Sequence, residues 1–144
     1  MNAQQRIGLV VQELHKLVES CLPGKTTFID YLTLFAQNEK DYKSLNEELE
    51  RLGSKQETNN GIKYKLSTPF QIGTETISLV RVRKPDVHRK EFGCVDLRFD
   101  SVTYDSLRSL ALEKGWDIIV RKTFEMIELS TFDTNVYAYI VKEL

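Results

Sequence analysis

Charged side chains at alternating positions are the best candidates for chemistry in this sequence. Asp96 and Arg98 are two residues apart in a segment that alternates between apolar and polar residues, and Arg81 and Arg83 are two apart in another. Residues two apart on a β-strand lie on the same face. Two or three guanidinium groups in one cleft would bind a carboxylate or a phosphate through paired hydrogen bonds. The alternative is a solvated face of cross-strand ion pairs, which contributes little to stability.

Tyrosines on strand-like segments are candidates for lining the same cleft. Tyr31 lies in an N-terminal segment of this kind, and Tyr137 and Tyr139 lie two apart near the C-terminus. The residues between and beside the latter two are aliphatic, so the opposite face of that strand suits packing against a helix. The tyrosine face is therefore the better candidate for the cleft. Aromatic residues at alternating positions are otherwise typical of a core, and this alternative stays open.

Other combinations that could do chemistry are weaker. Glu125 and Glu128 are three apart on a predicted strand, so they point to opposite faces and cannot form a facing pair. A thiol triad of Cys94, His88 and Asp96 would need the imidazole beside the sulfur, and nothing in the sequence places it there. Residues 23–27 read Pro-Gly-Lys-Thr-Thr but lack the upstream glycine of a phosphate-binding loop. The sequence thus carries no recognisable catalytic signature, and we expect no cofactor.

Composition is that of an ordinary globular domain. The 144 residues include 20 Lys and Arg against 21 Asp and Glu, which gives a net charge of -1. This balance argues against general nucleic-acid binding, which needs an excess of basic residues. Only Cys21 and Cys94 carry thiols, too few for a disulfide framework and without metal-ligand spacing. No apolar run approaches the ~18 residues of a membrane span, so we expect a cytoplasmic protein.

Hydrophobic periodicity predicts a mixture of helices and strands. An amphipathic helix is expected over 3–21 and ends at Pro23-Gly24. The remaining elements are predicted in the following order: strand 26–35, helix 38–52, strands 54–58, 62–66 and 76–83, a charged linker over 84–91, strand 94–99, helix 102–114, and strands 116–121, 124–129 and 135–141. Asn59-Asn60-Gly61 predicts a type I′ hairpin turn with positive φ, and residues 68–73 are expected to form a loop.

The order strand, helix and three strands occurs twice. Tyr42 and Gly53 in the first half have the same spacing as Tyr104 and Gly115 in the second, and each glycine is expected to end its helix. One such half cannot close its own core, because only one face of its sheet packs on its helix. Two halves together would enclose a partly polar cleft, a natural site for a small ligand.

We therefore predict an α+β fold in which two βαβββ modules form one curved, partly open barrel behind an N-terminal helix. The helix takes residues 1–22 and the paired domain residues 23–144, with modules at about 26–84 and 93–144. The N-terminal helix lies outside the repeat. It could cap the cleft, cover a sheet edge or contact a second copy of the chain, and the sequence does not choose among these.

This order of elements over residues 26–144 resembles that of the vicinal oxygen chelate superfamily, the glyoxalase and bleomycin-resistance type. The resemblance implies a cleft into which the first and last strands of each module project metal ligands, usually His or Gln on the first strand and Glu on the last. Alignment of 28–35 with 93–99 places Tyr31 and Asp96 at the first-strand positions. The last strands offer Arg81 or Arg83 in one module and Tyr137 or Tyr139 in the other. Because Arg cannot ligate a cation, the usual metal ligands are absent.

The resulting expectation is a metal-free small-molecule-binding protein with a fold like that of the superfamily. An anionic or aromatic ligand would be held by Arg81, Arg98 and Tyr137, with Asp96 orienting them and Tyr31 in the cleft. One alternative is a metal-dependent lyase or isomerase with atypical ligands. Another is a protein-interaction module whose cleft is filled and whose N-terminal helix binds a partner. We expect neither nucleic acid nor a membrane as partner, and a homodimer stays open.

Overall fold

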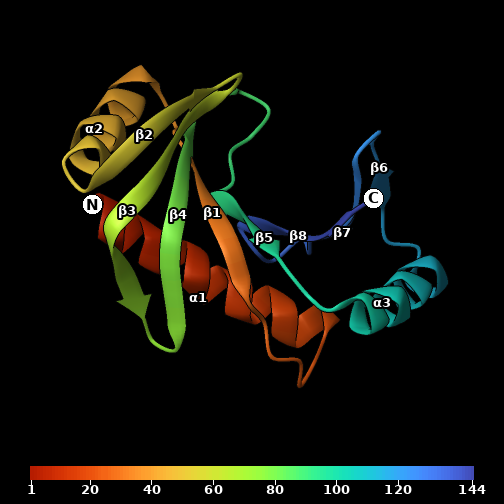
Figure 1. Cartoon of the computed structure of the whole chain (residues 1–144). Coiled ribbons are helices and arrows are strands. Elements are labelled where there is room, and N and C mark those ends of the chain that lie inside the picture. The colour runs from red at the N-terminus through yellow and green to blue at the C-terminus, as the bar shows by residue number, and fades with distance from the viewer.

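A computed structural model describes all residues 1–144 and contains three helices and eight strands (Figure 1). In chain order the elements are α1 (Ala3–Cys21), β1 (Ile29–Phe35), α2 (Glu39–Glu50), β2 (Gly53–Thr58), β3 (Gly61–Ile72), β4 (Glu75–Arg83), β5 (Gly93–Leu97), α3 (Ser101–Lys114), β6 (Ile118–Val120), β7 (Phe124–Leu129) and β8 (Val136–Glu143). None of the three helices combines the length and the hydropathy needed to span a bilayer.

All eight strands belong to one sheet, and its order is the same in both halves of the chain. The order is β2-β3-β4-β1-β5-β8-β7-β6, so each half reads β2-β3-β4-β1 or its counterpart β6-β7-β8-β5. Within each half the first strand pairs in parallel with the last, β1 with β4 and β5 with β8. The two halves meet where β1 pairs with β5 in antiparallel register. The predicted α+β fold and its repeated order of elements are therefore present.

The sheet is not closed, which differs from the predicted curved, partly open barrel. Strands β2 and β6 end the order and do not pair with each other, so both are edges. Each has features that discourage a further strand from pairing. Strand β2 carries mostly exposed polar residues, and β6 is only three residues long. Closure of a barrel requires pairing of the two terminal strands, and here each half ends in its own free edge instead.

One face of the sheet is covered by all three helices and holds the core. Helix α1 crosses the central strands β8, β1 and β5, while α2 packs on β2, β3 and β4 and α3 on β8 (Figure 1). The apolar stripe of α1 explains its place: Ile7, Val10, Leu14 and Leu17 recur at helical spacing and are fully buried. The predicted helix over 3–21 is confirmed, and its apolar face is occupied by the sheet.

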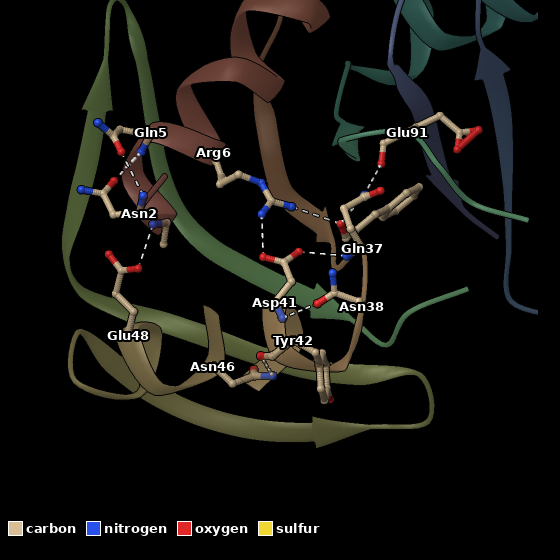
Figure 2. Close-up of polar contacts among 12 residues, drawn as sticks. Asn2, Gln5, Arg6, Gln37, Asn38, Asp41, Tyr42, Asn46, Glu48 and Glu91 are labelled. Atoms are coloured by element: carbon tan, nitrogen blue, oxygen red, sulfur yellow. Dashed lines mark hydrogen bonds and ion pairs between the residues drawn. The ribbon is translucent and has the colours of Figure 1, made fainter. Parts of the chain in front are cut away.

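Polar contacts fasten the N-terminal end of α1 to the first module (Figure 2). The Arg6 guanidinium lies 2.8 Å from the Asp41 carboxylate, and its other terminal nitrogen donates to the Phe35 carbonyl oxygen at 3.2 Å. Asp41 is also held by the cap of α2, because its own N–H donates to the Asn38 side chain. The predicted helix start at Asn38 is thus confirmed. Since both charged side chains are mostly buried, this contact fixes how α1 lies against α2.

Several predicted boundaries are wrong for local reasons. Residues 68–72 form the second half of β3 rather than a loop, because Phe70 pairs with Ile77 across the hairpin. Pro69, which lacks an N–H, falls at an irregularity in that pairing, where a strand tolerates it. The predicted strand at 26–28 is absent, since β1 begins at Ile29. At the other end, β6 covers only the centre of the predicted strand 116–121.

Glycines were interpreted correctly at one helix end and wrongly at the other. Gly115 ends α3 with φ of 74°, the left-handed conformation that glycine adopts without strain. Gly53 has no positive φ and begins β2, where a Cβ would strike the Lys65 carbonyl on β3. The hairpin at Asn59-Asn60 is present, but neither Asn has positive φ, so the turn is not type I′.

Gly93 is required where the two halves meet, and its replacement gives a first prediction. A Cβ at this position would strike the Thr33 carbonyl of the neighbouring strand β1, and backbone at the centre of a sheet cannot move aside freely. We expect Gly93→Ala to lower the free energy of unfolding by about 1–2 kcal/mol, measured by urea denaturation. The control is Gly8→Ala in α1, where a Cβ meets nothing within 4 Å. It should raise stability by about 0.5–1 kcal/mol. Equal effects of the two variants would contradict the packing argument.

Candidate functional site

A cavity of about 640 Å³ lies on the sheet face opposite the helices. This volume suits a small organic ligand. Its walls come from both halves: Tyr31 and Phe35 on β1, Arg81 and Arg83 on β4, Cys94, Asp96 and Arg98 on or beside β5, Thr123, Phe124 and Met126 on or beside β7, and Tyr139, Val141, Glu143 and Leu144 on or after β8. We refer to this cavity as the cleft. Four of the five residues predicted for a ligand site lie in its lining.

Strand alternation places these side chains on the cleft face. On β1 the residues Leu32 and Leu34 are fully buried in the core, so Tyr31 and Phe35 point the other way. On β4 the buried residues Val80 and Val82 have the same role and turn the arginines beside them toward the cleft. The face of each strand is thus decided by which of its residues are aliphatic.

Arg81 is half-buried, and its guanidinium uses only part of its hydrogen-bonding capacity. One terminal nitrogen donates to the Asn60 side chain at 3.2 Å, whereas Nε is buried and has no hydrogen-bond partner. An unpaired buried donor costs free energy that an acceptor would recover. Its neighbour Arg83 is already engaged, lying 3.8 Å from the Asp86 carboxylate and 5.4 Å from the Phe35 ring centroid. Of the two arginines on β4, Arg81 is therefore the one without an ion-pair partner.

Asp96 sits deep in the cleft without an ion-pair partner. None of the salt bridges of the protein involves its carboxylate. Burial raises the pKa of Asp96 to about 6, and the positive charge of Arg81 opposes that rise only in part. Because desolvation disfavours the charged form, a carboxylate here is held at a cost and would gain from a bound cation or hydrogen-bond donor. Asp96 was expected to orient the arginines, but no ion pair joins its carboxylate to any of them.

Tyr31 lies between the two charged groups. It pairs with Asp96 across the junction of the halves, and the Arg81 guanidinium carbon lies 5.9 Å from its ring centroid. The Lys63 ammonium on β3 approaches the same ring at 4.4 Å. Burial raises the pKa of Tyr31 to about 12, so its hydroxyl stays protonated at neutral pH. The side chain therefore offers the cleft a neutral hydroxyl and an aromatic surface.

Arg98 reaches one end of the cleft but is tied to its rim. Its guanidinium lies 3.1 Å from the Asp30 carboxylate and 3.4 Å from that of Glu143. All three side chains are at least one-third exposed, so these pairs contribute little to stability and could rearrange around a ligand. Arg98 therefore has less free hydrogen-bonding capacity than Arg81.

Tyr137 shares a face with Tyr139 as predicted, but the structure places it outside the cleft. The linker between the halves covers it: its hydroxyl donates to the Glu91 carboxylate at 2.6 Å, and the Arg89 guanidinium carbon lies 5.3 Å from its ring centroid. The other tyrosine of the pair, Tyr139, lines the cleft instead. A linker of this kind has no periodic pattern, so the side chains that it covers could not be predicted.

The apolar side of the cleft was not predicted from the sequence. Phe124 and Met126 on β7 and Val141 on β8 form this side, and we call them the apolar wall. The available signal was the alternation of β7, in which Phe124 and Met126 alternate with Glu125 and Ile127. Both faces of that strand carry apolar residues, so periodicity alone could not tell the cleft from the core.

The remaining candidate residues, the two glutamates and the thiol group, do not form the arrangements that their chemistry would need. Glu125 is buried on the helix face, where it accepts hydrogen bonds from Tyr104 at 2.6 Å and Arg108 at 2.8 Å. Glu128 pairs with Tyr139 on the cleft face, so the two glutamates do point to opposite faces. Cys94 is buried and His88 exposed, and burial raises the pKa of the Cys94 thiol to about 11, which leaves it unreactive.

The superfamily resemblance implies a divalent metal in the cleft, and the donor set does not fit one. No group of three or more His, Cys, Asp or Glu side chains converges anywhere in the chain. At the positions where the family pattern would place ligands, the cleft has Tyr31, Asp96, Arg81 and Tyr139. Only one of these is an anionic oxygen donor at neutral pH, and arginine repels a cation.

Comparisons with known proteins give a fold and no family. No protein-family model and no curated protein matches the chain. The structural-genomics protein EC4020 is similar with a TM-score of 0.64 at 17% sequence identity, over 91% of this chain and 81% of that one. A mutant of 4-hydroxymandelate synthase from Streptomyces coelicolor matches with a TM-score of 0.40 at 11% identity, over 83% of this chain and half of that one. The likeness to EC4020 shows a shared α+β fold alone.

Proposed function

We propose that the protein binds a small organic anion in the cleft without a metal, and that its fold is a divergent, open form of the vicinal oxygen chelate type. The repeated βαβββ order and the meeting of the halves at β1 and β5 support the proposed fold. The observation that carries the proposed function is that Arg81 lines the cleft while its buried Nε has no hydrogen-bond partner in the protein.

The anionic group would accept hydrogen bonds from Arg81 and, at the rim, from Arg98. A guanidinium offers parallel N–H donors that match a carboxylate or a phosphate. Both partners would be partly removed from water, which strengthens the charged hydrogen bonds. The rest of the ligand would lie against the apolar wall and the ring of Tyr31, so an aromatic or branched body fits the cleft.

A screen of small organic anions tests this function. Benzoate, phenyl phosphate and short aliphatic carboxylates are added to the protein in a buffer with a chelator, and binding is followed by thermal shift and NMR titration. We expect at least one of them to bind, and Arg81→Gln to weaken that binding by about 10- to 100-fold. Arg98→Gln should weaken it less, because Arg98 already has carboxylate partners.

Arg51→Gln is the matched control, since Arg51 is exposed at the end of α2, on the helix side of the sheet. It should leave binding unchanged. Absence of any anion binding, or binding that survives Arg81→Gln, would remove the proposed function. Binding that appears only after addition of Zn²⁺, Mn²⁺ or Ni²⁺ would favour the metal-dependent alternative.

A further inference from the structure

A row of polar side chains on the cleft face of the sheet changes sign at its middle. Strand register places Lys63 on β3 beside Arg81 on β4, Tyr31 on β1 beside Asp96 on β5, and Tyr139 on β8 between Asp96 and Glu128 on β7. The first module thus contributes cations to this row. The second module contributes carboxylates.

The charged groups of this row lack ion-pair partners, including the two nearest the middle. Neither Arg81 nor Asp96 takes part in any salt bridge of the protein. Their strands are separated by β1 alone, where Arg81 is level with Thr33 and Asp96 with Tyr31, so their backbones lie about 12 Å apart at the usual strand spacing and rise per residue. The Arg81 side chain extends over Tyr31, which is itself the cross-strand neighbour of Asp96. A small molecule over the Tyr31 ring would therefore contact both.

A ligand with one sign of charge would satisfy only one end of this row. A simple carboxylate would gain from Arg81 and be opposed by Asp96, and a simple amine would be opposed by Arg81. Like charges held close in a poorly solvated site repel each other strongly. A molecule that carries both charges would meet the opposite charge at each end, and its apolar part would be left for the wall beyond Tyr139.

We infer that the cleft takes a zwitterion, an α-amino acid with a large apolar side chain, whose carboxylate lies at Arg81 and whose ammonium group lies at Asp96. The side chain of this amino acid packs against the apolar wall. The inference rests on the proposed function, because it keeps the carboxylate of the ligand at Arg81, and it adds an ammonium group at Asp96.

Three probes that share one side chain test it: L-phenylalanine, 3-phenylpropionate, which lacks the ammonium group, and 2-phenylethylamine, which lacks the carboxylate. Their affinities are measured by NMR titration of the whole chain. We expect L-phenylalanine to bind about 10-fold or more tightly than either analogue, because each analogue leaves one charged group of the protein unpaired.

Substitutions at the two ends should act on different probes. Asp96→Asn should lower the affinity for L-phenylalanine by about 10- to 100-fold, whereas 3-phenylpropionate should bind as well as before or better. Arg81→Gln should weaken both. A purely structural effect of either substitution would weaken all three probes alike, and thermal unfolding of each variant shows whether it is folded. Asp105→Asn, at an exposed position on α3, is the control.

The outcomes separate this inference from the proposed function. If 3-phenylpropionate binds the natural protein as tightly as L-phenylalanine, the cleft is a site for simple anions, and the inference is overturned while the proposed function stands. If Asp96→Asn weakens both ligands equally, Asp96 does not meet the ammonium group and the inference is again overturned. If none of the three probes binds, the inference fails, and the screen of anions decides the proposed function separately.

Discussion

Deletion of residues 1–22 is expected to abolish cooperative folding. Helix α1 buries Ile7, Val10, Leu14 and Leu17 completely against the central strands, on the face opposite the cleft. Complete burial of one such side chain is worth roughly 1.5–3 kcal/mol, whereas a whole domain is stable by about 5–15 kcal/mol. The truncated chain would expose the core of both halves at once. Circular dichroism and urea denaturation should therefore show no cooperative transition.

A single substitution tests the same argument without the drastic deletion. Leu14→Ala should lower the free energy of unfolding by about 2–5 kcal/mol, because the side chain is fully buried and its removal leaves a cavity. Gln12→Ala, at an exposed position of the same helix, should change it by less than about 0.5 kcal/mol. If the truncated chain unfolds cooperatively and Leu14→Ala costs little, α1 is a detachable helix. The interaction-module alternative, which needs that helix for a partner, would then regain support.

Asp96→Asn is expected to stabilise the protein above neutral pH. Burial raises the pKa of Asp96 from 3.8 to about 6, so the folded protein holds a carboxylate there at a cost. A difference of ~2 pKa units corresponds to about 2–3 kcal/mol at a pH where both states are ionised. The neutral amide has nearly the same shape and avoids this cost. Urea denaturation at pH 8 should show a gain of that size.

The pH dependence of this gain follows from the sign of the pKa shift. Below about pH 4 the carboxyl group is protonated in the folded and unfolded states, so it contributes no difference. Between pH 4 and 6 the unfolded chain loses the proton first, and the natural protein becomes less stable as pH rises. Above pH 6 the full cost is present and stays constant. The advantage of Asp96→Asn should therefore vanish near pH 4 and be complete by pH 7.

Asp105→Asn serves as the control for the pH series, because Asp105 is exposed and pairs only with Lys142 on the surface. It should change stability little at any pH. A loss of stability in Asp96→Asn at pH 8 would mean that the attraction of the carboxylate to Arg81 outweighs its desolvation. Asp96 would then be a stabilising partner of Arg81 rather than a group held ready for a ligand.

Alternation along the strands predicted which side chains share a face, and this is why much of the cleft was found from the sequence. The period of two is a property of the extended backbone, so Tyr31, Arg81 and Asp96 had to lie opposite the aliphatic residues of their strands. The repeated order of elements was visible for a similar reason. Each amphipathic helix and strand is encoded by its own local pattern, and the patterns recur in the same order.

Features that depend on contact with another segment of the chain were not predictable. Residues 68–72 look like a loop because of Thr68 and Pro69, and only pairing with β4 makes them a strand. The covering of Tyr137 depends on how the linker lies, and that is decided by hydrogen bonds to both halves. The Gln37 side chain donates to the Glu91 carbonyl oxygen (Figure 2), and the Tyr137 hydroxyl donates to the Glu91 carboxylate. Closure of the sheet was overestimated because no pattern in a single strand reports whether the two terminal strands meet.

Because β1 and β5 join two modules of one polypeptide, the two sides of this sheet can differ in sequence, which two identical copies of one module could not. In a symmetric dimer each residue of one subunit has an identical counterpart across the axis, so an arginine on one side implies an arginine on the other. Because both modules belong to one polypeptide, they can mutate independently, and opposite walls can acquire opposite electrostatic character. Covalent linkage thereby permits a surface with opposite charge on its two sides, on which a ligand would bind in one orientation only.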